Sequence, residues 1–216
     1  MREIAQSWIG SQVTPNNWED YWLTEGLSNF FMREVLAQFN YRTYSLLESF
    51  SGNLSLWYNV RTLGGPNATY YTLHPVLHGD NPDETYNVVP FEKGFQFAWY
   101  MMDVLFGEFN MKDLMKYYVT NNSLTSINAF TGFRKTVSNW VMETYGGSKQ
   151  SVNNKLSTIF YEDWIYPKGL DPTGMNNFTT TESNAAVNLA NEYITLNGTG
   201  SPVDAATTYA GFVIPQ

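Results

Sequence analysis

The 216-residue sequence contains no cysteine and only two histidines. The absence of cysteine excludes a disulfide framework and any metal site built on thiolates, although it does not fix the compartment. Basic residues are also few, because 12 Lys and Arg stand against 20 Asp and Glu, which gives a formal net charge of −8. A chain without a basic excess offers no electrostatic footprint for nucleic acid or for an anionic membrane surface, so neither partner is predicted.

Long hydrophobic runs are missing as well. The longest apolar stretch, FQFAWYMMDVLFG, is too short to span a bilayer and is interrupted by Asp103, so it predicts a buried helix and no membrane span. The first residues show no basic segment followed by an apolar one, which is the pattern of a secretory signal. We therefore expect a soluble protein with a cytoplasmic location.

Aromatic residues are abundant, at 17% of the chain, whereas charged residues make up only 15%. A chain of this length can bury a sizeable core and fits one large domain. So few charges among so many aromatic side chains predict that much of the surface is covered by other protein.

Apolar residues recur mostly at three- and four-residue steps, which predicts a mainly α fold. Helices are expected over residues 18–39, 90–106, 111–119, 126–145 and 181–194. Weaker patterns predict a short helix and then irregular chain within residues 45–65, a boundary loop over 163–174 and an irregular tail after residue 196.

The stretch REIAQSW, residues 2–8, has the layout of a zinc hydrolase helix without its histidines. In that layout two histidines at positions i and i+4 face the same way and bind one zinc ion, and the intervening glutamate activates the metal-bound water. Here Glu3 is flanked by Arg2 and Gln6. The pattern alone leaves open an enzyme of another kind, a former enzyme and a coincidence.

A longer segment, REIAQSWIGSQVTPNNWEDYWLTEGL, resembles the metal-site segment of the zinc aminopeptidases of peptidase family M1, which are gluzincins. Two later segments, YNVVPFEKGF and DWIYPKGLDP, are similar to the leukotriene hydrolase branch of that family. The resemblance extends to about Ile194. It implies the helical part of a thermolysin-like catalytic domain over residues 1–175, and the start of a truncated helical domain in residues 176–216.

The resemblance assigns Arg2 and Gln6 to the positions of the first two zinc ligands, Glu25 to the third and Glu3 to the general base. A guanidinium is permanently cationic and has no lone pair to donate. A neutral amide oxygen is a poor replacement for imidazole on zinc. The resemblance therefore implies that the metal is lost and that the chain carries no cofactor.

Among the other positions of the implied catalytic site, some match the family and one does not. Phe91 stands where the family has the tyrosine whose hydroxyl stabilises the tetrahedral intermediate, so that oxyanion contact is missing. Tyr86 and Asp83 match positions that line the same site. His74 and His78 form an H-x-x-x-H pair, but a proline between them disfavours a regular helix, so a structural role is preferred to a replacement metal site.

Arg2 is expected to fill the space left by the metal and to pair with Glu25, Glu3 or both, because two carboxylates in one partly buried cleft need a cation. Both glutamates are expected to point into that cleft. As a buried pair, such a contact would be worth on the order of 3–5 kcal/mol when one partner is removed.

The sequence thus predicts a catalytically inactive, aminopeptidase-like subunit, a pseudo-enzyme with a structural or protein-binding role. Its expected partners are other protein chains in a hetero-assembly. One alternative is a weak or partner-completed zinc aminopeptidase or epoxide hydrolase-like enzyme. Another is a peptide-binding module that keeps the cleft and does not cut.

Overall fold

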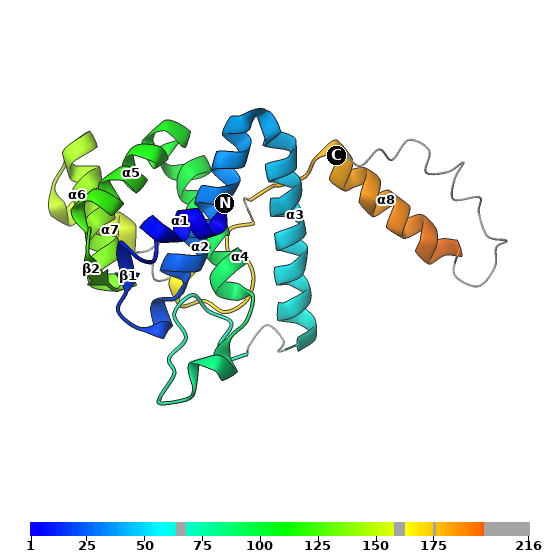
Figure 1. The fold of residues 1–216 in the computed structure, drawn as a ribbon, viewed down its shortest axis with the longest axis horizontal. Helices are drawn as coiled ribbons and strands as arrows, with labels where there is room; N and C mark the ends of the chain where they lie inside the picture. Colours follow the sequence, from blue (N-terminus) through cyan, green and yellow to red (C-terminus); the bar gives the residue numbers. More distant parts are fainter. Residues whose placement is uncertain (64–67, 158–162, 175, 197–216) are drawn as a thin grey trace. The chain divides into compact units, whose positions relative to one another are not determined.

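A computed structural model of the chain describes residues 1–63, 68–157, 163–174 and 176–196. The chain divides into two compact units, Met1–Phe178 and Thr179–Gln216. The first unit contains seven of the described helices: α1 (Arg2–Trp8), α2 (Trp22–Leu36), α3 (Arg42–Tyr58), α4 (Val89–Tyr100), α5 (Glu108–Asn121), α6 (Arg134–Tyr145) and α7 (Lys149–Ser157) (Figure 1). The second unit contains α8 (Thr181–Leu196). The fold is mainly α, as predicted.

Short segments of tighter or wider helix extend several of these elements. Two single 3₁₀ turns, at Trp18–Asp20 and Pro82–Thr85, precede α2 and α4. Wider π-helical turns follow α2, α3 and α4 and precede α6, at Ala37–Tyr41, Asn59–Leu63, Met101–Phe106 and Ala129–Phe133. Among the described residues, no helix is both long and apolar enough to cross a membrane.

The centre of the first unit is the contact between α2 and α4, with α3 on one side and α5, α6 and α7 on the other (Figure 1). The two central helices approach backbone to backbone at Gly26 and Gly94. A Cβ atom added at Gly26 would lie 2.6 Å from the Gly94 backbone, so only glycine allows this approach. The close crossing fixes α2, and with it the side chains that α2 carries.

A buried ion pair reinforces the same contact. The Arg33 guanidinium on α2 donates to both carboxylate oxygens of Glu92 on α4, at 2.9 and 3.0 Å. It also lies over the Phe95 ring, with its Cζ 4.2 Å from the ring centroid. A paired, fork-like geometry of this kind satisfies both buried charges.

Aromatic side chains fill the space around α2 and α4. Trp22 contacts Phe97 and Phe133, and Phe97 in turn stacks on Trp164 with ring centroids 5.2 Å apart. All four of these rings are fully buried. The high aromatic content of the sequence is therefore explained in part by this core.

A small sheet, which the sequence analysis did not predict, joins the N-terminal segment of the unit to the connection between α5 and α6. Strand β1 (Val13–Pro15) pairs in parallel with β2 (Thr125–Ile127). Each strand has only three residues, which is too short for the alternating pattern that predicts strands. The sheet holds the turn after α1 against the segment between α5 and α6.

Two of the predicted elements need correction, and one helix was missed. The helix expected over residues 126–145 begins only after β2, first as a π-helical turn and then as α6. The segment expected to be a short helix within residues 45–65 is the 17-residue helix α3, which continues as a π-helical turn. Helix α7 was not predicted at all, because its sequence, KQSVNNKLS, is mostly polar. The expected tail after residue 196 lies outside the described residues.

Candidate functional site

The first candidate residues stand on α1, a two-turn helix held against α2 at its C-terminal end. Ala5 and Ile9 are buried, and the Ser28 hydroxyl on α2 donates to the Ile9 carbonyl at 3.2 Å. Gly10 follows with φ +150, a conformation that L side chains rarely adopt, and lets the chain turn into β1. This anchorage places one face of α1 over the N-terminal part of α2.

Gln6 makes the direct contact with the carboxylate of Glu25. Its side-chain amide Nε2 donates to Glu25 Oε1 at 2.9 Å, and Glu25 is 4% exposed. The sequence analysis placed both residues at this site but did not predict their hydrogen bond. Because a buried carboxylate needs donors, the amide takes over part of the charge stabilisation that a bound metal would otherwise supply.

Arg2 lies beside the same carboxylate but at a longer distance. Its guanidinium is 3.8 Å from Glu25 Oε2 and 3.9 Å from Glu3 Oε1, and its side chain is 40% exposed. The expected ion pairs with both glutamates therefore exist. The expected burial of Arg2 is wrong, because its side chain is partly exposed, and solvent therefore screens its charge. The Cζ atom of Arg2 also stands 5.6 Å from the centre of the Phe91 ring.

The two glutamates have different environments. Only Glu25 lies in the cleft, whereas the Glu3 side chain is 80% exposed. The expectation that both would point into one cavity therefore holds for Glu25 alone. The Glu3 side chain lies in solvent, outside the cleft that holds Glu25.

Tyr21 belongs to this site although the sequence analysis missed it. It precedes α2 and lies one helical turn before Glu25, so its hydroxyl shares the cleft with that carboxylate. Burial, together with the neighbouring Glu25 carboxylate, raises the pKa of Tyr21. Its ring also contacts Phe91 edge to face, with centroids 6.1 Å apart. The four-residue spacing from Glu25 is the signal that could have identified it.

The remaining predicted residues lie at the edge of the site. Phe91, at the start of α4, packs between the rings of Tyr21 and Tyr86. Tyr86 is 66% exposed, and Asp83 is exposed in the 3₁₀ turn before it. Asp83 and Tyr86 line a separate hollow of about 40 Å³ together with Trp18. The structure thus groups Tyr86 with Phe91 but does not bring Asp83 to Glu25.

The residues at this site do not fit a catalytic zinc ion. Such an ion needs three protein ligands and one open position. Of the residues that the structure describes, Glu25 is the only carboxylate inside this cleft, Gln6 already donates its amide to it, and Arg2 places a positive charge alongside. Among the residues that the structure describes, no group of three or more His, Asp or Glu side chains could hold a metal ion.

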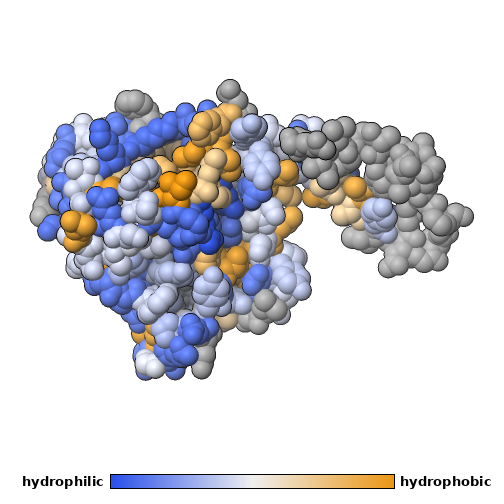
Figure 2. Space-filling view, viewed as in Figure 1, coloured by the Kyte–Doolittle hydropathy of each residue, from blue (hydrophilic) through white to orange (hydrophobic). Residues whose placement is uncertain are grey.

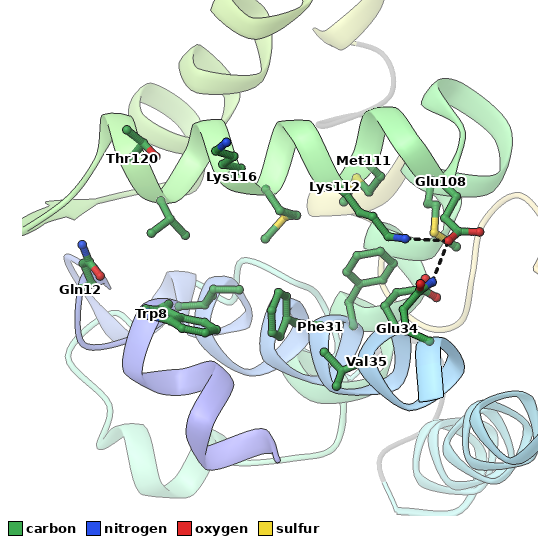
Figure 3. Close-up of a pocket in the computed structure, with 16 residues that line it drawn as sticks. Trp8, Gln12, Phe31, Glu34, Val35, Glu108, Met111, Lys112, Lys116 and Thr120 are labelled. Atoms are coloured by element: carbon green, nitrogen blue, oxygen red, sulfur yellow. Dashed lines mark hydrogen bonds and ion pairs between the residues drawn. The ribbon is translucent and has the colours of Figure 1, made fainter. Parts of the chain in front are cut away.

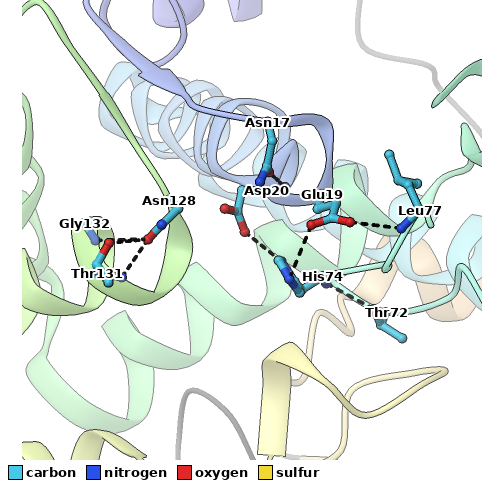
Figure 4. Close-up of polar contacts among 9 residues, drawn as sticks. All are labelled: Asn17, Glu19, Asp20, Thr72, His74, Leu77, Asn128, Thr131 and Gly132. Carbon is cyan, nitrogen blue, oxygen red and sulfur yellow. Dashed lines mark hydrogen bonds and ion pairs between the residues drawn. The ribbon is translucent and has the colours of Figure 1, made fainter. Parts of the chain in front are cut away.

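The two histidines have different surroundings. His74 Nδ1 lies 2.9 Å from the buried Asp20 Oδ1, and its Nε2 lies 3.8 Å from Glu19 (Figure 4). Glu19 also accepts from the backbone N–H of Leu77 at 2.9 Å. His78 is exposed, with φ 52. The structural role preferred for His74 matches these contacts, which tie the loop before α4 to the turn before α2.

An open cavity of about 540 Å³ lies next to the Gln6–Glu25 pair. Gln6, Trp18, Tyr21 and Glu25 contribute to its wall, together with the turn after α1. Trp18 is 58% exposed and its ring contacts Tyr21 with centroids 5.1 Å apart. A cleft with a carboxylate and two aromatic rings can bind a ligand without performing chemistry on it.

Comparison with known proteins places the chain in a family. Residues 1–164 match the peptidase family M1 domain, so the chain belongs to peptidase family M1. It is 29% identical over 208 residues to leucine aminopeptidase 2 of Chaetomium globosum, which covers 95% of this chain and 32% of that protein. It is 28% identical over 202 residues to a leukotriene A-4 hydrolase homolog of Botryotinia fuckeliana, covering 94% of this chain and 30% of the relative.

Solved structures agree on the fold. Yeast LTA4 hydrolase in complex with bestatin superposes with a TM-score of 0.79 at 22% identity, covering 98% of this chain and 32% of that one. An M1 zinc metallopeptidase from Deinococcus radiodurans, carrying the E323A substitution, gives a TM-score of 0.51 at 14% identity, covering 78% of this chain and 34% of that one. The sequence relatives support the leukotriene hydrolase branch. The chain spans about a third of the length of the relatives it matches.

Proposed function

We propose that this chain is a non-catalytic member of peptidase family M1 that holds no catalytic zinc and serves as a structural or protein-binding subunit of a larger complex. The observation that carries the proposal is the contact between Gln6 and Glu25. A residue that should be a zinc ligand instead donates a 2.9 Å hydrogen bond to the one carboxylate that could still bind the metal. Gln6 thereby satisfies one oxygen of the carboxylate, and the Arg2 guanidinium lies 3.8 Å from the other, which has no hydrogen-bond partner among the described residues.

The missing hydroxyl at Phe91 supports the same conclusion independently. Removing one oxyanion donor costs roughly 10²–10³ in kcat in a well-studied hydrolase. Loss of the metal removes the activated water as well, and the two losses affect different parts of the reaction. Activity of the kind that the relatives' names describe is therefore not expected from these residues.

Exposed apolar side chains support the binding role. Ile4 and Trp8 on α1 are 63% and 45% exposed, and Trp57 and Tyr58 on α3 are 44% and 56% exposed. Figure 2 shows hydrophobic surface over α1 and the neighbouring part of α2. Side chains of this size gathered on a surface are typical of protein interaction sites.

A second candidate function is peptide binding without cleavage. The cavity of about 540 Å³ beside Glu25 favours it, because the cleft remains open although its chemistry has changed. Peptides that co-purify with the native protein and are lost in a Trp18→Ala variant would support this candidate. A native protein that carries no peptide, and gains no stability from added peptides, would contradict it.

Zinc content and aminopeptidase activity test the main proposal together. The purified protein is stripped with a chelator, incubated with micromolar zinc, desalted and measured by mass spectrometry, and hydrolysis of aminoacyl-coumarin substrates is followed in parallel. We expect no stoichiometric zinc and no hydrolysis. The control is an Arg2→His/Gln6→His variant, which restores the ligand pair and should bind zinc. One zinc per native molecule, or hydrolysis that a chelator abolishes, would overturn the proposal.

A further inference from the structure

An apolar groove of about 460 Å³ lies between α2 and α5, beside the C-terminal end of α1 (Figure 3). On α5, the lining residues recur at steps of three, four or one over three turns: Glu108, Met111, Lys112, Met115, Lys116, Val119 and Thr120. They therefore form one continuous helix face. On α2, the facing set is Phe30, Phe31, Glu34 and Val35, so the groove is a seam between two helix faces.

The floor and wall of the groove are hydrophobic and adaptable. Phe30, Met111 and Met115 are buried at its base. Trp8 and Phe31 contact each other edge to face along one wall, with ring centroids 5.7 Å apart. Methionine side chains adjust their shape to a partner, so a Met-lined floor is typical of surfaces that bind apolar side chains.

A buried carboxylate with an unused oxygen lies at one end of the groove. Glu34 Oε1 accepts from Arg42 at 3.3 Å, but Glu34 Oε2 is buried and has no hydrogen-bond partner among the described residues. Burial raises the pKa of Glu34. The neighbouring Glu108 is already satisfied, because Lys112 and Gln38 donate to it at 2.9 and 3.0 Å. At this end of the groove, Glu34 Oε2 is therefore the carboxylate oxygen that lacks a donor among the described residues.

The opposite charge lies further along the same groove. Lys116 lies two helical turns beyond Glu108 on α5, about 12 Å at 1.5 Å per residue, and has no ion-pair or hydrogen-bond partner within the described part of the chain. Exposed apolar surface continues past this end, since Ile4 and Trp8 on α1 are largely uncovered. The groove thus has an apolar floor, an acceptor at one end and a cation towards the other.

We infer that this groove binds an amphipathic helix of a partner protein. The helix lays one apolar face along the methionine floor, directs an acidic residue to Lys116 and directs a lysine or arginine to Glu34 about two turns away. Helices pack in such seams at interaxial distances of 8–10 Å, and an apolar face with spacing i, i+3, i+7 fills them. The inference rests on the proposed binding role and specifies the chemistry of the partner.

The test uses designed helical peptides of about four turns, labelled with a fluorophore and titrated with the whole chain. Their apolar face carries leucine, and one Glu and one Lys are placed two turns apart in either order, because the direction of the bound helix is not fixed. The expected result is saturable binding of one order at micromolar concentration. Phe31→Ala should weaken it at least about fivefold, as expected for an aromatic residue at the centre of an interface.

A charge swap distinguishes binding of an oriented helix from non-specific hydrophobic binding. Lys116→Glu should weaken binding of the preferred peptide roughly two- to fivefold, which is the contribution expected of an exposed ion pair. Replacing the peptide's Glu by Lys should restore the affinity. Lys135→Glu, an exposed site on α6, is the matched control and should change nothing.

Two results would overturn the inference. The first is no peptide binding, including the case in which a fatty acid such as dodecanoate occupies the groove instead. The second is that both charge orders bind equally well and that Phe31→Ala leaves this binding unchanged. Zinc content is measured separately, so failure of the helix-binding inference leaves the metal-free assignment intact, and the reverse also holds.

Discussion

Helix α2 carries two regions that differ in how their charged side chains are held: the partly open site at Glu25 and the buried contact with α4. Its N-terminal part presents Glu25 to a site whose other ligand positions hold Arg2 and Gln6, whereas its buried face still meets α4 through Gly26 and the Arg33–Glu92 pair. In the first region, Gln6 donates a hydrogen bond to Glu25 and the partly exposed Arg2 forms a long ion pair with it. The second keeps contacts that leave little freedom. A fold depends on its close-packed interior, so ligands at its surface can change while the fold remains.

The largest expected effect separates a buried arginine from an exposed one. Arg33→Ala leaves Glu92 buried and uncompensated and should lower the free energy of unfolding by about 3–5 kcal/mol. Arg2→Ala, the matched variant beside Glu25, should cost no more than about 1 kcal/mol, because the Arg2 side chain is 40% exposed, its two ion pairs are 3.8 and 3.9 Å long, and Gln6 still donates to Glu25. Urea denaturation measures both. Equal losses would remove the distinction between the two regions.

A smaller effect is expected where the two helices touch. Gly26→Ala adds a Cβ atom 2.6 Å from the Gly94 backbone, so the helices must separate. Overpacking of this kind should cost about 1–3 kcal/mol, although alanine is the better helix former. Ser151→Ala at an exposed position of α7 is the control, and it should be neutral or slightly stabilising. A Gly26→Ala protein with the same free energy of unfolding as the native protein would show that α2 and α4 are not closely packed at Gly26.

The smallest effect concerns Lys93, which is buried on α4 and donates to the Pro167 carbonyl. Burial lowers the pKa of Lys93 from 10.5 to about 8. Above pH 8 the unfolded chain therefore binds more protons at this lysine than the folded chain does, and stability should rise with pH. The slope approaches about 1 kcal/mol per pH unit.

The window for this test ends near pH 10. Burial raises the pKa of Tyr118, so ionisation of that tyrosine in the unfolded chain lowers stability at higher pH. Thermal melting between pH 8 and pH 10 measures the slope, with Lys93→Met as the variant that should lose it. A wild-type slope identical to that of the variant would show that Lys93 does not cause it.

Much of the fold could be predicted from periodicity, but the contacts that distinguish the two regions could not. The apolar steps from Trp18 to Phe39 predicted α2. The apolar run before Gly107 predicted a single helix, which the structure forms as α4 and a π-helical turn. The crossing at Gly26 depends on which helix lies opposite, and one sequence does not contain that information. The three-residue strands were missed for lack of pattern.

The sequence predicted which residues form the candidate site better than it predicted how they contact one another. The resemblance to peptidase family M1 grouped Arg2, Gln6 and Glu25, and the structure brings these three together. Electrostatic reasoning chose Arg2 as the main partner of Glu25, but the shorter Gln6 side chain makes the closer contact and Arg2 remains partly in solvent. The groove between α2 and α5 required the tertiary pairing of those helices, which periodicity does not provide.

The thermal shift caused by zinc tests the central claim most directly. A ligand that binds only the folded state raises its stability in proportion to the logarithm of its concentration over Kd. Melting curves of the native chain and of the Arg2→His/Gln6→His variant are compared with and without micromolar zinc, at one protein concentration and one pH. The account predicts that the native melting temperature does not move and that the variant's rises. A rise in the native chain as large as that of the variant would contradict it.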